Sequence, residues 1–592
     1  MKRDREAVET NGKNVQKRRK LSSKFTPTLA ECGHKDLLDI EAKGLISRPR
    51  PTDAPSVELE TSHGEVRPDT GRRRGQERQV FEVYVEELSS TGDGLARHPA
   101  RDHVFAIPFA LPGDRVNIKA FEPSEEDIWS NADFVEAIEP SELRAGTKPK
   151  CKYFAQCGGC QFQMISYDEQ LKYKKTVVEN AFRYFSGLDP EQVPPIGDTG
   201  ASPLQYGYRT KLTPHFDGPR KGERLSVDKP PPIGFMRKGF RQTMDIESCP
   251  IATDIVQDGL RHERSKTIKK IDTYKRGATI LLRETTDRTF DKGESNGGGN
   301  ADSVFAKTDS PFPGGALELG SLPLQSTSQS QPPHIPEIVN NYVYKPTTDP
   351  SAPPTTIREK KLYTTENDTF ATEHIGSYIF KPAPAPSSRT ITPSCPHPTQ
   401  PIKYLLDAYC GSGLFAITLS PLFTSVLGIE LDPWGVTSAR ENARLNGVEH
   451  AGFIEADAAA LFQDVPYPAE NTVLVIDPPR KGCSTDFLKQ LLRYGPARVV
   501  YVSCNVGSQA RDVGCLVRGW CGEDWWKEVE GREDEGKEVG SFRYEIEELR
   551  GFDFFPQTSH VEGLCVLRRV VNEAWKEPEN EPEQEQPEKQ LE

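Results

Sequence analysis

The sequence predicts an α/β protein with a parallel sheet in its C-terminal third, preceded by a small β-barrel and a central α+β region. From 404 to about 570, apolar strand-like segments alternate with helical ones, as in parallel sheets whose strands are joined by helices. Between 79 and 138, short alternating segments are separated by turns at 91–94 and 111–114, which favours a small barrel. The length of 592 residues leaves room for further segments.

Parts of the chain are too polar to bury a core. Hydrophobic residues make up 35% of the sequence, and Pro (49) and Gly (47) together account for about one residue in six. Such composition does not bury enough apolar surface to offset the entropy of ordering the chain. We expect disorder in residues 1–76, in a low-complexity insertion at 285–360, and in an acidic tail at 571–592.

The net charge of −13 argues against a nucleic-acid partner until its distribution is considered. Residues 573–592 hold eight Glu against two Lys, and 523–538 form a second acidic run. Residues 151–283, by contrast, carry 22 Lys and Arg against 15 Asp and Glu, a local balance of +7. A basic folded region suits contact with RNA phosphates, so we expect RNA as the partner.

The ends of the chain and its cysteines bear on location. Residues 1–20 hold eight Lys and Arg against three acids, which fits a bipartite nuclear localisation signal and equally a solvated tail. No run of 18 apolar residues occurs, and twelve Cys without a dense framework suit a reducing compartment. We expect an intracellular, non-secreted monomer without membrane contact, in the nucleus and/or cytoplasm, with mitochondria as a further location.

A glycine turn after the strand at 404–408 predicts a nucleotide-type site. Gly411 and Gly413 allow a tight turn and a close approach of the backbone to a ligand at a helix start. The next strand ends in Glu430, whose carboxylate can accept both hydroxyls of a ribose, and a third strand ends near Asp457. This order resembles class I (Rossmann-like) S-adenosylmethionine methyltransferases more than dehydrogenases.

Two further strands end in residues that suit chemistry on a base. The strand at 473–476 runs into Asp477, and the strand at 499–503 runs into Cys504. Carboxyl ends of parallel strands meet at one edge of a sheet, where ligands bind. A thiolate that adds to C6 of uracil makes C5 nucleophilic toward a methyl group, and a base must then remove the C5 proton. A cysteine ending a strand is otherwise a small buried apolar residue.

Taken together, the motifs resemble the RNA 5-methyluridine (uracil-C5) methyltransferase family. The matching motifs are Ser503-Cys504-Asn505 and the segments 476–482 and 553–562, within a resemblance that covers 77–283 and 361–570. Fungal-type members that methylate uridine 54 of tRNA are the most similar.

The resemblance implies a role for each site residue. Cys504 matches the nucleophile, Glu562 the base that takes the C5 proton, and Asp477 the acid that contacts base and cofactor. His560 matches an orienting neighbour of Glu562. The residues expected to bind S-adenosyl-L-methionine are Tyr409, Gly411, Gly413, Glu430, Asp457 and Asp477.

The resemblance also implies the domain organisation. We expect the following order: a disordered basic region (1–76), an OB-like TRAM domain (77–146), a central RNA-binding subdomain (147–284), the insertion (285–360), a remnant of the junction (361–400), the methyltransferase domain (401–570) and the acidic tail (571–592).

Four cysteines of the central region form a candidate metal site. Cys151, Cys157 and Cys160 are followed much later by Cys249, which precedes a proline as some iron–sulfur ligands do, and the spacing is not that of a zinc ribbon. Family members with this pattern hold a [4Fe–4S] cluster, which the resemblance implies here. A zinc site or four structural cysteines are the alternatives.

One segment departs from the family pattern. Family members carry an F-x-Q-x-N segment and a helix before the cofactor strand, and the Gln contacts the methionine part of the cofactor. Here 369–380 matches the strand that leads into it, but no such motif lies between Phe380 and Tyr404. We expect several tens of residues to be missing, through a deletion or a mispredicted gene.

We therefore expect a methyltransferase acting on uridine C5 of RNA, most readily uridine 54 in the T-loop of tRNA, through a covalent Cys504 adduct at C6. The alternative is an RNA-binding, tRNA-chaperone protein of the same fold whose catalysis is impaired by the missing segment. A third hypothesis is a methyltransferase acting on cytosine, which also uses a cysteine adduct but lacks the combination of Asp-Pro-Pro-Arg (477–480) with His-x-Glu (560–562).

Overall fold

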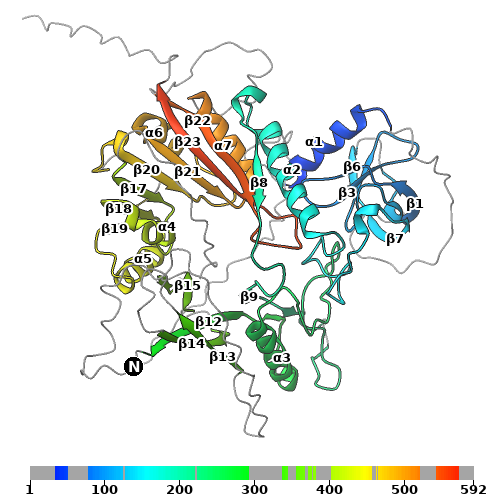
Figure 1. The fold of residues 1–592 in the computed structure, drawn as a ribbon. Helices are drawn as coiled ribbons and strands as arrows, with labels where there is room; N and C mark the ends of the chain where they lie inside the picture. Colours follow the sequence, from blue (N-terminus) through cyan, green and yellow to red (C-terminus); the bar gives the residue numbers. More distant parts are fainter. Residues whose placement is uncertain are drawn as a thin grey trace, which may run out of the picture.

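The computed structural model describes residues 34–50, 78–123, 127–219, 223–291, 336–344, 355–366, 371–375, 378–381, 402–456, 462, 465–519 and 542–571. Figure 1 shows a large sheet, two small sheets over residues 78–139, which we call the barrel after the fold expected for them, and a central region between and below these parts.

The largest sheet has eight strands in the order β19-β18-β17-β20-β21-β23-β22-β8. Its first five strands are parallel, whereas β23 runs antiparallel to both β21 and β22. Every residue of β20 and β21 is buried, as expected for strands covered on both faces. The strands are β8 (Gly197–Gly200), β17 (Tyr404–Ala408), β18 (Ser425–Glu430), β19 (Ala451–Glu455), β20 (Thr472–Ile476), β21 (Arg498–Ser503), β22 (Phe542–Phe552) and β23 (Glu562–Val571).

Helices cover both faces of this sheet. Side chains of β20 alternate between two cores: Val473 and Val475 face α4 (Leu414–Thr418) and α5 (Pro433–Leu445). Leu474 and Ile476 face α6 (Thr485–Tyr494), α7 (Val506–Arg518) and α2 (Tyr167–Phe185). The α/β fold with a parallel sheet is therefore confirmed.

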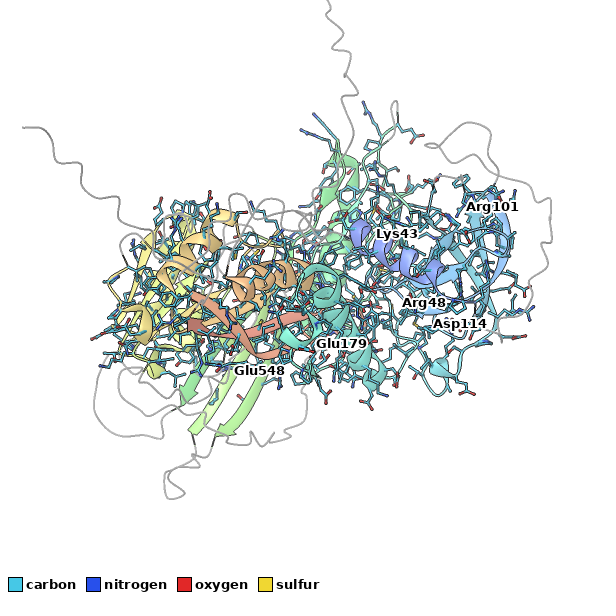
Figure 2. All side chains as sticks on the ribbon, turned by 90° about the horizontal axis from the view of Figure 1, so that it is seen from above. Lys43, Arg48, Arg101, Asp114, Glu179 and Glu548 are labelled. Atoms are coloured by element: carbon cyan, nitrogen blue, oxygen red, sulfur yellow. The ribbon has the colours of Figure 1, made fainter. Side chains whose placement is uncertain are left out.

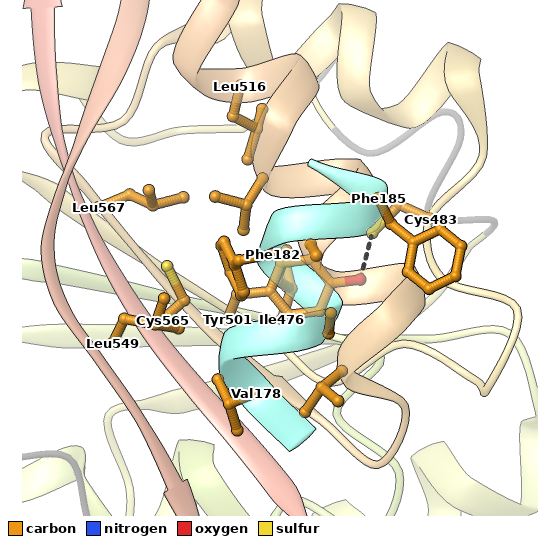
Figure 3. Close-up of a cluster of buried hydrophobic side chains, with 14 of the residues drawn as sticks. Val178, Phe182, Phe185, Ile476, Cys483, Tyr501, Leu516, Leu549, Cys565 and Leu567 are labelled. Atoms are coloured by element: carbon orange, nitrogen blue, oxygen red, sulfur yellow. Dashed lines mark hydrogen bonds between the residues drawn. The ribbon is translucent and has the colours of Figure 1, made fainter. Parts of the chain in front are cut away.

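Helix α2 belongs to the central region and packs against the eight-stranded sheet, with which it shares one hydrophobic core. Figure 3 shows Val178 and Phe182 of this helix beside Tyr501 and Leu567 of the sheet. The 3.6-residue period of a helix places these side chains on one apolar face. In Figure 2, Glu179 of α2 lies between Glu548 of β22 and the barrel.

Residues 78–139 form two small sheets around one core, with strand orders β1-β5-β7 and β2-β3-β4-β6. Buried and half-buried residues alternate along β5, the pattern of a strand with one face on a core. The strands expected in this region are confirmed. They are β1 (Arg78–Tyr84), β2 (Glu87–Leu88), β3 (Gly94–Arg97), β4 (Val104–Ile107), β5 (Arg115–Phe121), β6 (Trp129–Asn131) and β7 (Asp133–Glu139).

Helix α1 (His34–Ser47) packs against this barrel, so disorder is wrong for that part of 1–76. Leu38, Ala42 and Leu45 share a buried cluster with Val104 of β4. Three apolar residues in a polar segment are a weak signal in sequence, and they are stabilised by burial against the barrel. Residues 1–33 and 51–77 lie outside the described residues.

The central region holds a second sheet, in the order β13-β14-β12-β9, on which α3 (Asp254–Lys269) packs. Strand β13 falls inside 285–360, so that segment is not wholly an unstructured insertion; its residues 292–335 and 345–354 lie outside the described ones. The strands here are β9 (Lys211–Leu212), β10 (His215–Phe216), β11 (Ala278–Thr279), β12 (Leu282–Asp291), β13 (Glu337–Tyr344), β14 (Thr355–Thr364), β15 (Glu373–Ile375) and β16 (Tyr378–Phe380).

Candidate active site

Strand register brings the predicted site residues to one edge of the large sheet. Ala408 of β17 pairs with Ile429 of β18 on one side and with Ile476 of β20 on the other. Tyr409, Glu430 and Asp477, which follow these residues, therefore leave the sheet side by side. This edge is formed by the carboxyl ends of the parallel strands, which is where the sequence predicts these three residues.

Cys504 and Glu562 meet at the same edge because β23 is antiparallel to β21. Ser503 pairs with Gly563, so Cys504, which follows Ser503, lies beside Glu562, which precedes Gly563. Burial raises the pKa of the Cys504 thiol, and the Glu562 and Asp477 carboxylates raise it further. The Arg480 guanidinium, which hydrogen-bonds the thiol, opposes this shift.

Asp477 is a carboxylic acid whose pKa is raised close to neutral pH. It remains open to solvent, yet the protein packed around it raises its pKa to about 7, and the nearby Glu562 carboxylate contributes. A carboxyl with such a pKa is able to hold a proton or release one at physiological pH. It is therefore suited to donating a hydrogen bond to a base that gains negative charge.

Glu562 is almost fully buried and is paired with a histidine. Its Oε1 lies 3.3 Å from Nε2 of His560, and the His560 ring packs edge-on against Phe555 with ring centroids 4.7 Å apart. His560 thus orients the carboxylate beside Cys504. The orienting role expected for His560 stays a prediction that this contact supports.

Asn505 and Ser508 fix the position of Cys504, and neither was assigned a role from the sequence, although Asn505 belongs to one of the motifs that carry the resemblance. Asn505 caps α7 by accepting the Gly507 N–H at 3.1 Å, and its amide donates to the Arg480 carbonyl at 2.9 Å. The Ser508 hydroxyl donates to the same carbonyl at 3.0 Å. These hydrogen bonds connect the segment that carries the Cys504 thiol to the Asp-Pro-Pro-Arg loop (477–480). An Asn immediately before a helical stretch was the available signal.

The glycine turn is held by two carboxylates, the half-buried Glu430 and the fully buried Asp407. Both glycines adopt positive φ, +53° at Gly411 and +86° at Gly413, which L side chains rarely adopt. Glu430 accepts the Gly411 N–H at 2.9 Å. Asp407 accepts the Ala416 N–H at 2.8 Å, and burial raises its pKa to about 8.

The turn offers space and polar groups for a ligand. A Cβ at Gly411 would meet no atom of the described protein within 4 Å, so one side of the turn is open. Oδ1 of Asp407 is buried and has no hydrogen-bond partner among the described residues. Tyr409 is the only other residue of this turn with positive φ (+64°) that the structure describes. Asp457 lies outside the described residues.

The segment that departs from the family pattern packs directly on the cofactor half of the domain. Phe380 of β16 is fully buried in the core formed with α4 and α5. The N–H groups of Ile379 and Lys381 donate to the side chains of Asn446 and Asn442, at 2.7 and 2.8 Å. The residues between Lys381 and Ile402 are outside the described ranges.

The four cysteines of the central region lie within electrostatic reach of one another, but not as a metal site. Neighbouring thiols and burial raise the pKa of Cys160 to about 12 and that of Cys249 to about 11, burial having the larger effect. In the part of the chain that the structure describes, no group of three or more Cys, His, Asp or Glu side chains is arranged to hold a metal ion. Cys151 and Cys157 belong to the same neighbourhood. The expected ligand geometry is therefore not found.

Basic and aromatic side chains are interleaved around this neighbourhood. Lys150 lies over the Tyr206 ring at 4.3 Å, and Arg237 lies over the Phe240 ring at 5.1 Å. Such pairs suit contact with phosphates and unstacked bases. Tyr208, an aromatic residue of the same basic region, donates its hydroxyl to the Pro556 carbonyl at 2.9 Å.

Comparison with known proteins identifies similar families and relatives. The family model described as tRNA (Uracil-5-)-methyltransferase matches residues 361–518, and the TRAM domain model matches residues 74–125.

Two curated fungal proteins are similar over most of their length. The tRNA (uracil(54)-C(5))-methyltransferase of Schizosaccharomyces pombe is 40% identical over 504 residues, covering 83% of this chain and 79% of that protein. The Saccharomyces cerevisiae protein of the same name is 37% identical over 525 residues, covering 83% of this chain and 74% of that protein. The crystal structure of Pyrococcus abyssi tRNA (uracil-54, C5)-methyltransferase in complex with S-adenosyl-L-homocysteine aligns with 19% identity and a TM-score of 0.47, covering 82% of this chain and 100% of that chain.

Proposed function

Because the chain belongs to the tRNA (uracil-5-)-methyltransferase family, we propose that it methylates C5 of uridine 54 in tRNA with S-adenosyl-L-methionine as the methyl donor. The observation that carries the proposal is the placement of the Cys504 thiol beside two carboxylates, Glu562 and Asp477, and the Arg480 guanidinium. That set contains a nucleophile, a base, an acid and a cation that stabilises the thiolate.

The glycine turn and its carboxylates fit the cofactor. Glu430 uses one lone pair of each carboxylate oxygen on the N–H groups of Gly411 and Asp432, which leaves acceptor capacity for ribose hydroxyls. The open side of Gly411 and the unpartnered Oδ1 of Asp407 provide room and a polar contact. S-adenosyl-L-methionine supplies an electrophilic methyl group when bound.

Cys504 begins the reaction on the uracil ring. Its thiolate forms a bond to C6, and electron density moves to C5 and the ring carbonyl as an enolate. Asp477, whose pKa is about 7, stabilises that charge by hydrogen bonding to the ring. C5 then bonds to the methyl carbon of the donor while that carbon's bond to sulfur breaks, which leaves S-adenosyl-L-homocysteine, and C5 still carries the proton that must be removed.

Glu562 completes the reaction. Its carboxylate takes the C5 proton, the C5–C6 double bond re-forms, and the thiolate leaves C6 with the electron pair of the C–S bond. His560, 3.3 Å away, holds the carboxylate in place. Methylated uridine and free Cys504 thiolate result.

The RNA-binding part of the proposal rests on the barrel and the central region. The segment 74–125 matches the TRAM domain, and residues 151–283 carry a charge balance of +7. The cation–aromatic pairs at Lys150 and Arg237 support contact with a flipped nucleotide and its phosphates. Salt-dependent binding of tRNA is expected.

Transfer of radiolabelled methyl groups to unmodified tRNA tests the function. We expect labelling by the intact chain, none by Cys504→Ala, and near-normal labelling by Cys515→Ala, which removes another thiol of the same domain. Replacing uridine 54 with cytidine in the transcript is expected to abolish labelling. Labelling that survives Cys504→Ala would contradict the nucleophile. tRNA binding without labelling would favour the RNA-binding, chaperone function.

We propose separately that the four cysteines of the central region hold a [4Fe–4S] cluster. The support is their shared neighbourhood and the chemistry of four thiols, although the arrangement described above does not match metal coordination. We derive no catalytic step from it. Iron and sulfide content with visible absorbance after anaerobic purification tests it; zinc, or no metal, contradicts it.

We further propose a monomer in the nucleus and/or cytoplasm, and in mitochondria as a further location, on the strength of the basic segment 1–20. No helix of the described ranges is long and apolar enough to span a bilayer. Light scattering after size exclusion and imaging of a tagged chain with and without residues 1–20 test these proposals.

A further inference from the structure

The loop at 553–561 joins β22 to β23 and ends at Glu562. Its backbone is held largely by residues from far away in the sequence, in the segment just before and within α2. The Gln557 carbonyl accepts the N–H groups of Gln161 and Phe162 at 2.7 and 3.1 Å. The catalytic loop, as we call 553–561, is thus docked on the central region.

Two buried side-chain amides form the centre of this contact. Oε1 of Gln170 accepts the backbone N–H of Gln557 at 2.9 Å, and Nε2 of Gln170 donates to Oε1 of Gln557 at 3.2 Å. The two residues are only 1% and 2% exposed, so water does not compete for these bonds. Nε2 of Gln170 also lies within hydrogen-bond distance of the Phe162 and Ile165 carbonyls.

The backbone of Gln557 needs this support. Its φ of +72° is in the left-handed region, which costs free energy for a residue with a Cβ. The amide of Gln170 meets both the N–H and the side chain of Gln557 in that conformation. Losing Gln170 would leave the N–H of Gln557 buried without its partner, and the loop would relax.

Neighbouring residues of the catalytic loop are held in the same way. Lys174, four residues after Gln170 on α2, forms a fully buried ion pair with Asp553 and donates to the Phe555 carbonyl at 3.0 Å. Tyr208 donates to the Pro556 carbonyl. The carbonyls of three consecutive residues are therefore held by the central region and the segment leading into α2.

These contacts set the position of the base. Ser559 donates its N–H to Oε1 of Gln161 at 3.0 Å, and the next residue is His560, which contacts Glu562. Register with β21 then places Glu562 beside Cys504. A shift at Gln557 would propagate over five residues to the carboxylate.

We propose that Gln170 is a positioning residue for the base Glu562, acting through Gln557. The proposal rests on the function proposed above. Its chemical consequence is confined to the last step. Without a well-placed Glu562, the C5 proton stays, the thiolate is not expelled, and the enzyme remains bonded to methylated RNA through the Cys504 sulfur and C6.

The test compares Gln170→Met with Lys172→Ala in the full chain. Methionine is close in size to glutamine but neither donates nor accepts as the amide does, while Lys172 is an exposed residue two positions along the same helix. Gln557→Ala removes the other partner and provides a second variant should Gln170→Met unfold. Thermal unfolding and S-adenosyl-L-homocysteine binding establish that each variant is folded.

Steady-state and denaturing-gel assays on unmodified tRNA provide the readouts. For Gln170→Met we expect kcat to fall by about 10-fold to 100-fold, as for a misplaced catalytic group, with KM for tRNA nearly unchanged. A methylated RNA–protein complex stable to denaturation should accumulate for Gln170→Met and Gln557→Ala, but not for Lys172→Ala. Additional replacement of Cys504 should abolish it.

Two results would overturn the proposal. One is turnover per folded molecule of Gln170→Met equal to that of Lys172→Ala. The other is a fall in kcat without accumulation of the methylated complex, which would place the defect before proton removal. If the unaltered chain does not methylate uridine, the proposed function itself fails, which is a distinguishable outcome.

Discussion

The side chain of Asn442 on α5 accepts the backbone N–H of Lys381 at 2.8 Å and donates to the carbonyl of Ser412 at 3.0 Å. Asn442 is fully buried, so one amide joins the end of β16 to the middle of the glycine turn. The segment that lacks the family's F-x-Q-x-N motif is thereby connected to the cofactor site. Replacing Asn442 tests how this segment affects the cofactor site.

Replacing Asn442 with Ala is expected to destabilise the domain by about 1–3 kcal/mol, because it removes both hydrogen bonds of a buried amide and leaves a part-buried N–H and a part-buried carbonyl without these partners. The glycine turn should also bind S-adenosyl-L-homocysteine more weakly. Chemical denaturation and calorimetry measure the two effects. Glu441→Ala, one residue away with a surface ion pair to Lys381 at 3.7 Å, is the control and should change stability by at most about 1 kcal/mol. An Asn442→Ala protein indistinguishable from this control would contradict the coupling.

The two glycines of the turn should respond differently to alanine. Both have positive φ, but a Cβ at Gly413 would lie only 3.1 Å from Ile417 and 3.2 Å from both Ala439 and Phe453, whereas one at Gly411 faces open space. We expect Gly413→Ala to lower stability by several kcal/mol from strain and crowding together.

Gly411→Ala is expected to cost roughly 1–2 kcal/mol of stability from φ alone, while it weakens cofactor binding by filling the space beside the turn. Differential scanning calorimetry and titration with S-adenosyl-L-homocysteine separate stability from affinity. Unchanged affinity in folded Gly411→Ala would show that the ligand does not approach this side of the turn.

The sequence predicted the edge of the large sheet well because the signal there is local. Asp477 and Cys504 each follow a short, wholly buried strand with an apolar centre, and parallel strands covered by helices must present such residues at one edge. The place of Glu562 could be predicted only from the family resemblance. It begins an antiparallel strand, so the rule for the carboxyl ends of parallel strands does not apply to it. Register between β21 and β23 explains its place beside Cys504.

The residues that hold the site in place from distant parts of the chain could not be predicted from local sequence patterns. Gln170 and Gln557 are 387 residues apart, and nothing in either local pattern indicates a partner. The docking of α1 likewise depends on a barrel surface that forms elsewhere in the chain. The same limit applies to the metal site: the four cysteines share one neighbourhood, but no group of ligands that could hold a metal ion is found among the described residues, so the cluster stays a proposal.

Docking of α1 on the barrel should weaken as pH rises. Glu41 of this helix is buried and accepts the backbone N–H of Ser90 at 2.9 Å, and burial raises its pKa from 4.5 to about 7. The folded state holds the Glu41 proton more tightly than the unfolded one, so stability falls as pH rises from about 4.5 to 7 and is level above that.

Hydrogen exchange of residues 34–47 at pH 5 and pH 8 measures this effect, which should be on the order of 1–3 kcal/mol. Glu41→Gln is expected to remove most of the pH dependence. Glu87→Gln removes a partly exposed carboxylate, paired with Arg48, that contributes to the raised pKa of Glu41, so it should weaken the pH dependence without removing it. Equal pH dependence in Glu41→Gln and the unaltered chain would assign it to another group.

Reactivity of Cys504 should depend on Arg480. The pKa of this thiol is raised by burial and by the Glu562 and Asp477 carboxylates, and Arg480 is the cation that opposes them. Arg480→Met should therefore raise the pKa further and move the pH profile of Cys504 alkylation to higher pH. Glu562→Gln removes a negative charge and should move the profile downward.

Alkylation by iodoacetamide, followed at the Cys504 peptide by mass spectrometry between pH 6 and 10, measures both shifts. Lys481→Met is the control, because this exposed neighbour does not influence the thiol, and its profile should match that of the unaltered chain. Since only the thiolate attacks C6, Arg480→Met should also slow methylation at pH 7, and raising the pH should restore part of the rate. A profile that stays in place in Arg480→Met would mean that the guanidinium holds the loop through geometry and not through its charge.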